Sequence, residues 1–230
     1  MAGAVVHLGT GCDGVAVCAE EVKAEAGSDT GKAARAARDA GLPGLEFFGG
    51  IPGSVGGAVR MNAGAYGHET FDALVKVWCV NERGDEVEVE PAALKPRYRG
   101  IELPAGWLVK AGMWKLAAGE KEAIRQRMRE INHARSGSQP LHLPSSGSWF
   151  KNVVLPRDVE GLGKAGEKVN AWKVVDAAGC RGWREGGAQV SEQHCNFFVN
   201  GGGATCAEWE RLSVRVEGGF TAKLGRVMGR

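Results

Sequence analysis

Seven glycines fall within the nineteen residues at positions 49–67, and this segment limits the possible folds of the chain more than any other. Its sequence reads GGIPGSVGGAVRMNAGAYG. Glycine has no Cβ atom, so the backbone here can approach a ligand or a neighbouring strand closely. Consecutive backbone N–H groups in such loops also form concave sites that bind phosphate. The segment therefore predicts either a phosphate-binding loop or a tightly packed turn.

The overall composition excludes several classes of protein. Hydrophobic residues make up 43% of the 230 residues and charged residues 24%, which is typical of a globular protein. The net charge of +2 is too small for a nucleic-acid-binding surface. The six cysteines form no C-x-x-C pair, so the sequence predicts no zinc or other metal site. We expect a small-molecule ligand, with no nucleic acid partner.

The chain also lacks the hydrophobic segments that direct proteins to membranes. No run of eighteen apolar residues is present, and no basic segment followed by an apolar stretch opens the sequence. Scattered cysteines in a chain of this size are typical of reduced thiols in the cytosol. We therefore expect a cytoplasmic protein without a membrane partner, and we expect it to be a monomer.

The hydrophobic periodicity predicts a mixture of helices and strands. Apolar or alanine residues recur at helical spacing in four segments: 29–40, 120–134, 172–178 and 208–216. Strand-like composition marks the segments 5–22, 71–80, 86–89, 108–116 and 196–199. The turn at 81–85 joins two of these strands into a hairpin. Serine, proline and glycine dominate 136–148, which indicates a loop or linker. The sequence thus predicts an α+β fold in two parts, 1–117 and 118–230.

Three further segments carry polar groups suited to chemistry. The first is Tyr98-Arg99-Gly100, where an arginine exposed to solvent is the simpler interpretation. The second is GSWFKN at 147–152, which also fits a loop-to-strand junction. The third spans 176–200 and contains His194, which has no fixed partner in the sequence. A structural, hydrogen-bonded histidine is the favoured interpretation there.

The glycine-rich segment resembles the flavin-binding signature of the UDP-N-acetylenolpyruvoylglucosamine reductase family, GIPG-x-x-GG-A-x-x-MNAGAYG. The resemblance implies that this chain binds FAD and that NADPH supplies the hydride. It implies an α+β fold in which 1–117 belong to a FAD-binding domain of the vanillyl-alcohol-oxidase type and 118–230 to a substrate domain. The residues implied to contact the flavin are Gly53, Ser54, Gly57, Ala58, Asn62, Gly64, Ala65 and Tyr66.

The other segments resemble further signatures of the same family. Tyr98-Arg99 resembles its Tyr-Arg-x-Ser motif, which implies that Arg99 stabilises an enolate and that Tyr98 lies near the substrate. GSWFKN resembles G-S-x-F-K-N, which implies a proton donor at Ser148 and substrate contacts by Lys151 and Asn152. The implied reaction reduces UDP-N-acetylglucosamine enolpyruvate, a nucleotide sugar, to UDP-N-acetylmuramate in peptidoglycan synthesis. The segment 176–200 resembles the family's substrate domain.

Two departures from the family pattern support an alternative function. The resemblance implies that the chain begins after the family's first flavin-binding lobe, so only the second lobe is expected. At the other end, aligning residues 226–229 on the family's Arg-x-Ile-Gly strand puts Leu224 where a catalytic glutamate is expected. Leucine transfers no proton. The alternative is therefore a truncated or diverged, non-catalytic homologue that at most binds a nucleotide or a partner.

Overall fold

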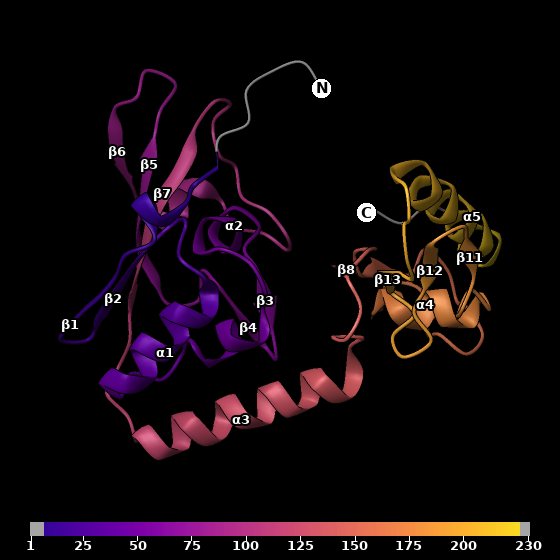
Figure 1. Cartoon of the computed structure of the whole chain (residues 1–230), viewed down its shortest axis with the longest axis horizontal. Helices are drawn as coiled ribbons and strands as arrows, with labels where there is room; N and C mark the ends of the chain where they lie inside the picture. The colour runs from indigo at the N-terminus through magenta and orange to yellow at the C-terminus, as the bar shows by residue number, and fades with distance from the viewer. Residues whose placement is uncertain (1–6, 226–230) are drawn as a thin grey trace. The chain divides into compact units, whose positions relative to one another are not determined.

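The computed structural model describes residues 7–225 and divides the chain into two compact units. Unit 1 extends to Arg135 and unit 2 begins at Ser136 (Figure 1). The division lies later than the predicted boundary at 117/118, because the long helix α3 (Lys121–Ser138) packs on unit 1. Ile124 and Met128 of this helix are buried in the unit 1 core. The division falls instead at the start of the predicted linker, 136–148.

Unit 1 is built on a five-stranded antiparallel sheet with the order β1-β2-β7-β5-β6. The strands are β1 (Val15–Cys18), β2 (Glu21–Glu25), β5 (Leu74–Val80), β6 (Glu86–Val89) and β7 (Leu108–Lys115). The predicted hairpin is confirmed, since β5 and β6 pair antiparallel around the turn. A second, short hairpin joins β3 (Gly64–Ala65) to β4 (His68–Glu69) within the glycine-rich segment.

Helices α1 (Thr30–Ala40) and α2 (Val55–Arg60) complete unit 1, with short 3₁₀ helices at Thr10–Cys12, Glu46–Gly50 and Pro91–Leu94. The sequence predicts both ends of α1 correctly. The Asp29 side chain accepts a hydrogen bond from the Lys32 N–H at the start, and Gly41 adopts a left-handed conformation at the end. The helix face formed by Ala33, Ala34 and Ala37 is buried.

Trp114 on β7 is the largest fully buried side chain of unit 1. Its ring meets the edge of Phe48, with the ring centroids 5.5 Å apart. Its indole Nε1–H donates to the Thr70 carbonyl at 2.8 Å, so the buried polar atom is satisfied. This contact fixes the segment that follows the β3–β4 hairpin against the sheet, and therefore positions one side of the candidate site.

Unit 2 contains a four-stranded antiparallel sheet with the order β11-β12-β13-β8. Its strands are β8 (Ser145–Ser148), β11 (Arg184–Glu185), β12 (Ala188–Val190) and β13 (Phe197–Asn200). A separate pair joins β9 (Val153–Val154) to β10 (Lys168–Val169). Helices α4 (Ala171–Ala177) and α5 (Cys206–Leu224) pack against each other beside the sheet.

Helix α5 is longer than the predicted helix at 208–216. Thr205 and Glu208 form a capping box at its start, and Val216, Phe220 and Leu224 continue its buried face. Leu224 is therefore the last residue of a helix and 1% exposed in the unit 2 core, so its assignment to a strand is wrong. The Arg226–Gly229 part of that alignment lies outside the described residues. Among the described helices, none is long and apolar enough to cross a membrane.

Candidate functional site

The glycine-rich segment combines tight packing at some glycines with exposed backbone at others. Gly50 and Gly56 serve tight packing, because a Cβ atom at Gly56 would lie 2.7 Å from the Ala26 Cβ and one at Gly50 would lie 2.7 Å from Ile131. Gly53 has a φ of +116°, and a Cβ atom there would meet nothing within 4 Å. Gly57 is exposed as well. The segment thus presents an open backbone surface at Gly53, Ser54 and Gly57.

Other residues of the segment hold it in place. Ala58 is 4% exposed and belongs to the core. Asn62 is 1% exposed, and its side-chain amide donates to the Glu69 carboxylate at 2.7 Å and to the Arg97 carbonyl at 3.3 Å. Its side-chain oxygen accepts from the Phe71 N–H at 3.2 Å. These bonds occupy the side chain that the sequence offers to a flavin, so Asn62 maintains the loop instead.

Backbone strain is concentrated in this region. Five described residues other than glycine have a positive φ, and three of them are Asn62, Tyr66 and Arg99, at 40°, 55° and 58°. Such conformations cost about 1–3 kcal/mol each and persist where the surrounding structure enforces them. The Tyr66 hydroxyl donates to the Ile131 carbonyl at 3.3 Å, which ties the strained loop to helix α3.

Arg99 lies against the glycine-rich segment. A terminal nitrogen of its guanidinium donates to the Gly64 carbonyl at 2.9 Å. The same guanidinium lies 4.8 Å from the ring centroid of Tyr98. Gly64, Ala65 and Arg99 are each half-buried. The fold thus brings together two motifs that are about thirty-five residues apart in the sequence.

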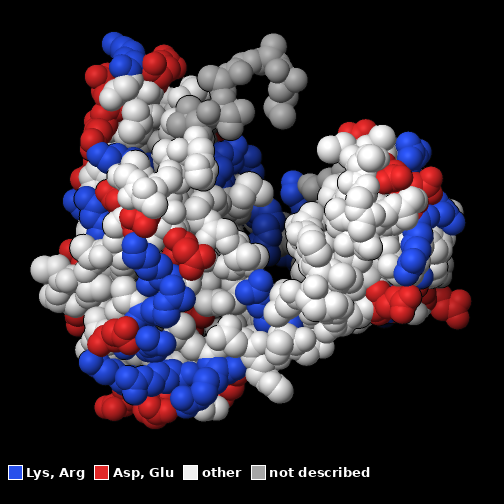
Figure 2. Space-filling model, in the orientation of Figure 1, with Lys and Arg blue, Asp and Glu red and all other residues white. Residues whose placement is uncertain are grey.

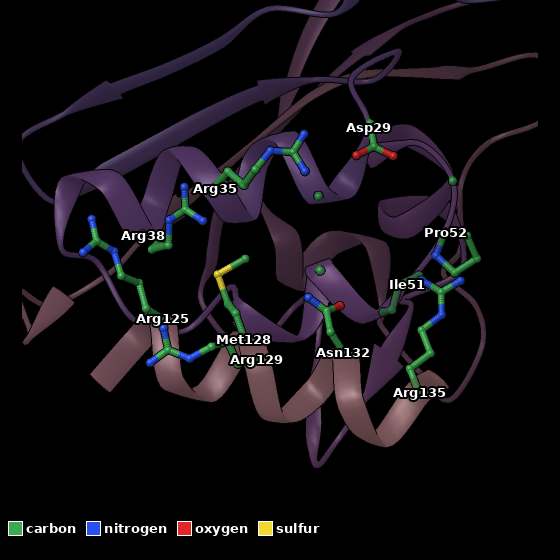
Figure 3. A pocket seen from close by; sticks show the side chains of 13 residues that line it. Asp29, Arg35, Arg38, Ile51, Pro52, Arg125, Met128, Arg129, Asn132 and Arg135 are labelled. Carbon is green, nitrogen blue, oxygen red and sulfur yellow. The ribbon is translucent and has the colours of Figure 1, made fainter. Parts of the chain in front are cut away.

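A cavity of about 580 Å³ opens beside the same segment in unit 1. Gly49, Ile51, Pro52 and Gly53 form one part of its wall, and α1 and α3 form the rest (Figure 3). Five arginines and a single carboxylate, Asp29, line it. The cavity is therefore strongly basic and adjoins the open backbone at Gly53.

The predicted residues of the GSWFKN motif lie together in unit 2. Ser148 ends β8, and both its side chain and that of Lys151 are exposed. Neither side chain has a hydrogen bond or ion pair with another of the described residues. The Asn152 side chain instead accepts from the Ala171 N–H at 3.0 Å and donates to Asn170 at 3.1 Å, at the start of α4. Ser148 and Lys151 are thus available to a ligand, while Asn152 fixes a helix end.

The Asn196 side chain holds the motif in place through two hydrogen bonds to Phe150. Its side-chain oxygen accepts from the Phe150 N–H at 3.0 Å, and its amide donates to the Phe150 carbonyl at 2.9 Å. Asn196 is 4% exposed. For Phe150, which lies two positions after Ser148, these two bonds take the place of pairing with a neighbouring strand. They therefore position the exposed serine relative to the unit 2 core.

We expect Asn196→Ala to destabilise the protein by about 2–4 kcal/mol, because it leaves two buried backbone groups of Phe150 without partners. Urea unfolding monitored by the fluorescence of the tryptophans measures the change. The neighbouring Gln193 is exposed, and Gln193→Ala is expected to cost less than about 1 kcal/mol. Equal stability of Asn196→Ala and the wild-type protein would show that this pairing has no structural role.

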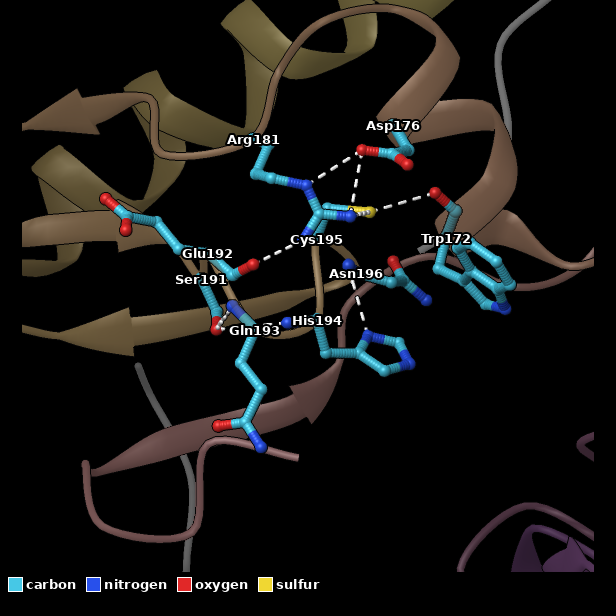
Figure 4. Close-up of polar contacts among 9 residues, drawn as sticks. All are labelled: Trp172, Asp176, Arg181, Ser191, Glu192, Gln193, His194, Cys195 and Asn196. Atoms are coloured by element: carbon cyan, nitrogen blue, oxygen red, sulfur yellow. Dashed lines mark hydrogen bonds and ion pairs between the residues drawn. The ribbon is translucent and has the colours of Figure 1, made fainter. Parts of the chain in front are cut away.

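The His194 segment is held by a network of polar contacts (Figure 4). The Ser191 hydroxyl accepts from the His194 N–H at 3.3 Å, and His194 Nδ1 accepts from the Asn196 N–H at 3.3 Å. The imidazole also packs against Phe197, with ring centroids 4.7 Å apart. Burial lowers the pKa of His194, which favours the neutral ring. These contacts support a structural histidine, as the sequence favours.

Arg181 closes the same network. Its guanidinium donates to Asp176 at 2.9 Å and to the Glu192 carbonyl, and it lies 3.8 Å from the Cys195 sulfur. Burial raises the pKa of the Cys195 thiol to about 11, so this cysteine remains protonated and unreactive near neutral pH. Among residues 7–225, no cluster of three or more His, Cys, Asp or Glu side chains is arranged to hold a metal ion.

The lowered pKa of His194 predicts a pH dependence of stability. Its ordinary value is 6.5, so below that pH the unfolded chain binds a proton that the folded chain does not. The free energy of unfolding should therefore decrease as the pH falls through 6.5. In His194→Asn this contribution is absent. Between pH 7.5 and pH 5.5 the free energy of unfolding, measured with denaturant, should therefore fall by less in the variant than in the wild-type protein. An equal fall in both proteins would contradict the lowered pKa of His194.

Sequence patterns alone do not reveal several residues of the site. The Asn62 side chain is held by hydrogen bonds to Glu69 and to the Arg97 carbonyl, which lie seven and thirty-five residues further along the sequence. The Ser-x-x-His spacing of Ser191 and His194 is a local signal that could have indicated their hydrogen bond. The basic cavity depends on the crossing of two helices, which helical periodicity does not predict.

Comparison with known proteins identifies the family. A model of the UDP-N-acetylenolpyruvoylglucosamine reductase C-terminal domain matches residues 139–228, and a FAD binding domain model matches residues 2–90. The reductase of Magnetococcus marinus is 44% identical over 83% of this chain and 57% of its own length. That of Paracoccus denitrificans is 43% identical, over 91% of this chain and 68% of its own length.

A solved structure agrees with these matches. The crystal structure of UDP-N-acetylenolpyruvylglucosamine reductase from Thermus caldophilus aligns with a TM-score of 0.74 and 35% identity, over 90% of this chain and 70% of that one. The chain spans 57–65% of the length of the first three curated relatives it matches. The predicted α+β fold, a FAD-binding segment followed by the reductase's C-terminal domain, is confirmed. The chain belongs to the UDP-N-acetylenolpyruvoylglucosamine reductase family.

Proposed function

We propose that this protein acts as a UDP-N-acetylenolpyruvoylglucosamine reductase, with FAD as cofactor and NADPH as reductant. The observation that carries the proposal is the contact between Arg99 and the Gly64 carbonyl, since it joins a cation to the glycine-rich segment. The substrate is then the enolpyruvyl ether of a UDP-linked sugar. The product is UDP-N-acetylmuramate, a precursor of peptidoglycan, made in the cytoplasm.

The residues present fit a flavin dinucleotide. Gly53 and Gly57 leave the backbone accessible where a Cβ atom would restrict it, and Ser54 adds a hydroxyl between them. Gly64, Ala65 and Tyr66 would face the ring system from the β3–β4 hairpin, next to Arg99. When bound, FAD would supply the hydride transfer that no amino-acid side chain offers.

The side chains of this chain would supply the remaining steps. The guanidinium of Arg99 always carries a positive charge and would stabilise the negative charge that develops on the enolate oxygen. The exposed hydroxyl of Ser148 would donate the proton that completes the reduction. Lys151, exposed beside it, would bind the substrate's diphosphate. Tyr98 would contact the substrate next to Arg99.

A titration of the purified protein with FAD tests cofactor binding. The fluorescence of FAD should change and saturate on binding. Gly57→Asp should weaken the affinity at least about tenfold, because it places a carboxylate next to the expected pyrophosphate. Gly57→Ala is the matched control and should lose less affinity than Gly57→Asp, because it adds a Cβ atom without a charge and that atom would lie 3.5 Å from its nearest neighbour, the Ser54 hydroxyl oxygen. Equal affinities for all three proteins would contradict the assignment of the segment.

A second candidate function is that of a non-catalytic homologue, because residues 7–225 supply no identified counterpart of the family's catalytic glutamate. Leu224, which the alignment assigns to that position, is instead buried at the end of helix α5. Such a homologue would bind a flavin or a nucleotide sugar and turn nothing over. Flavin binding without substrate turnover would favour this second function, whereas turnover would exclude it.

A further inference from the structure

We propose that the basic cavity between α1 and α3 is a second anion site, which binds a small molecule carrying two or more linked phosphate groups. The cavity shares Gly49–Gly53 with the glycine-rich segment, but its charged side chains come from the two helices (Figure 3). Arg35 and Arg38 lie on α1, and Arg125, Arg129 and Arg135 lie on α3. The inference does not depend on the proposed reductase activity.

Helical spacing directs these arginines toward one space. Arg35 and Arg38 are three residues apart, and Arg125 and Arg129 are four apart, so each pair lies on one face of its helix. The side chain of Met128 lies between the two helices (Figure 3) and is 8% exposed. In Figure 2, Lys and Arg side chains form a continuous band over the part of unit 1 that contains α1 and α3.

The surrounding carboxylates do not balance this charge. Asp39 pairs with Arg38 at 2.9 Å, and Glu122 contacts Arg129 at 2.7 Å and Arg125 at 3.6 Å. Asp29 lines the cavity, but its side chain already accepts the Lys32 N–H. Three of the arginines thus share two carboxylates, Asp39 and Glu122. A ligand with negative charges would add to the neutralisation of this basic cluster.

Arg35 is the most informative residue of this set. It is exposed, and no residue between 7 and 225 forms a hydrogen bond or ion pair with its side chain. Its guanidinium lies over the first turn of α1, since a Cβ atom built on Gly31 would be 3.1 Å from one of its nitrogens. The Asp29 carboxylate already caps the start of this helix. The guanidinium of Arg35 is therefore the group here that remains available to an anion.

The size of the cavity favours a linked pair of phosphates over a single ion. At about 580 Å³ it is larger than one phosphate group requires, and its arginines extend from Arg38 to Arg135 along both helices. Guanidinium groups recognise phosphate oxygens through two parallel hydrogen bonds. Two phosphates joined by a bridging oxygen could therefore use arginines of α1 and α3 at the same time.

Isothermal titration calorimetry with inorganic pyrophosphate, at constant ionic strength, tests the proposal. We expect saturable binding to the full chain, and weaker binding of orthophosphate and sulfate. Arg35→Ala should weaken pyrophosphate binding at least about fivefold, and Arg35→Ala with Arg129→Ala more than about twentyfold. Arg127→Ala is the matched control, because Arg127 lies on α3 outside this cavity and pairs with Glu130. It should stay within about twofold of the wild-type protein.

Two results would overturn the proposal. The first is pyrophosphate binding that is absent, or equally strong in the double variant and the wild-type protein. The second is loss of pyrophosphate binding when FAD saturates the protein, which would make the cavity part of the flavin site. Circular dichroism of each variant checks folding, and Arg35→Lys, which keeps the charge, should retain more of the affinity than Arg35→Ala.

Discussion

Ser148→Ala is expected to lower turnover of the enolpyruvyl sugar nucleotide by about 10²–10⁴-fold, the usual contribution of a positioned proton donor. The serine is exposed at the end of β8, and the Asn196–Phe150 bonds fix the chain just after it. Removing its hydroxyl removes the donor and little else. NADPH-dependent bleaching of the flavin absorbance should be unchanged, because that half of the reaction needs no proton from the serine.

Ser146→Ala provides the control for this substitution. Ser146 is exposed on the same strand, two positions before Ser148. Its substitution should leave turnover within about twofold. Steady-state turnover and single-turnover bleaching, measured on both variants, separate the two halves of the reaction. Wild-type turnover by Ser148→Ala would eliminate this serine as the proton donor.

Arg99→Ala is expected to reduce turnover by about 10²–10³-fold, because it removes a cation that would stabilise charge in the transition state. The substitution also removes the bond to the Gly64 carbonyl, so FAD affinity should fall to a smaller extent. Arg99→Lys keeps the charge but loses the planar fork of donors, and should recover only part of the rate.

Arg97→Ala is the matched control for Arg99. Arg97 is exposed, forms a surface ion pair with Glu102 at 3.5 Å, and supports Asn62 through its backbone carbonyl, which alanine retains. Its turnover should match that of the wild-type protein. Loss of turnover in Arg97→Ala together with normal turnover in Arg99→Ala would show that the essential cation is Arg97 and not Arg99.

The local elements of this fold could be predicted from the sequence because their signals are local. Asp29 and Gly41 mark the two ends of α1, and the spacing of Ile124, Met128 and Ile131 gives the buried face of α3. Helix α5 extends beyond its prediction because Gly218 and Gly219 weaken the helical signal. In the structure Gly219 is tightly packed, since a Cβ atom there would lie 3.0 Å from the Cys180 sulfur.

The candidate site could be predicted only in part. Motifs identify Gly53, Gly57, Arg99 and Ser148, and all four present an accessible group. They do not distinguish ligand-binding residues from supporting ones, so Asn62 and Asn152 hold the fold with side chains that the sequence offers to a ligand. The arginine cavity needs two helices to come together, and that arrangement depends on contacts between α3 and a core formed mainly by earlier residues.

The most direct test of the account is an anaerobic cycle on the purified chain loaded with FAD. We predict that NADPH bleaches the visible absorbance of the flavin, on the order of seconds or faster for a working reductase. Addition of UDP-N-acetylglucosamine enolpyruvate should then restore the absorbance and yield UDP-N-acetylmuramate. A chain that takes up no FAD, or that stays bleached after the sugar nucleotide is added, would contradict the assignment of reductase activity to this protein.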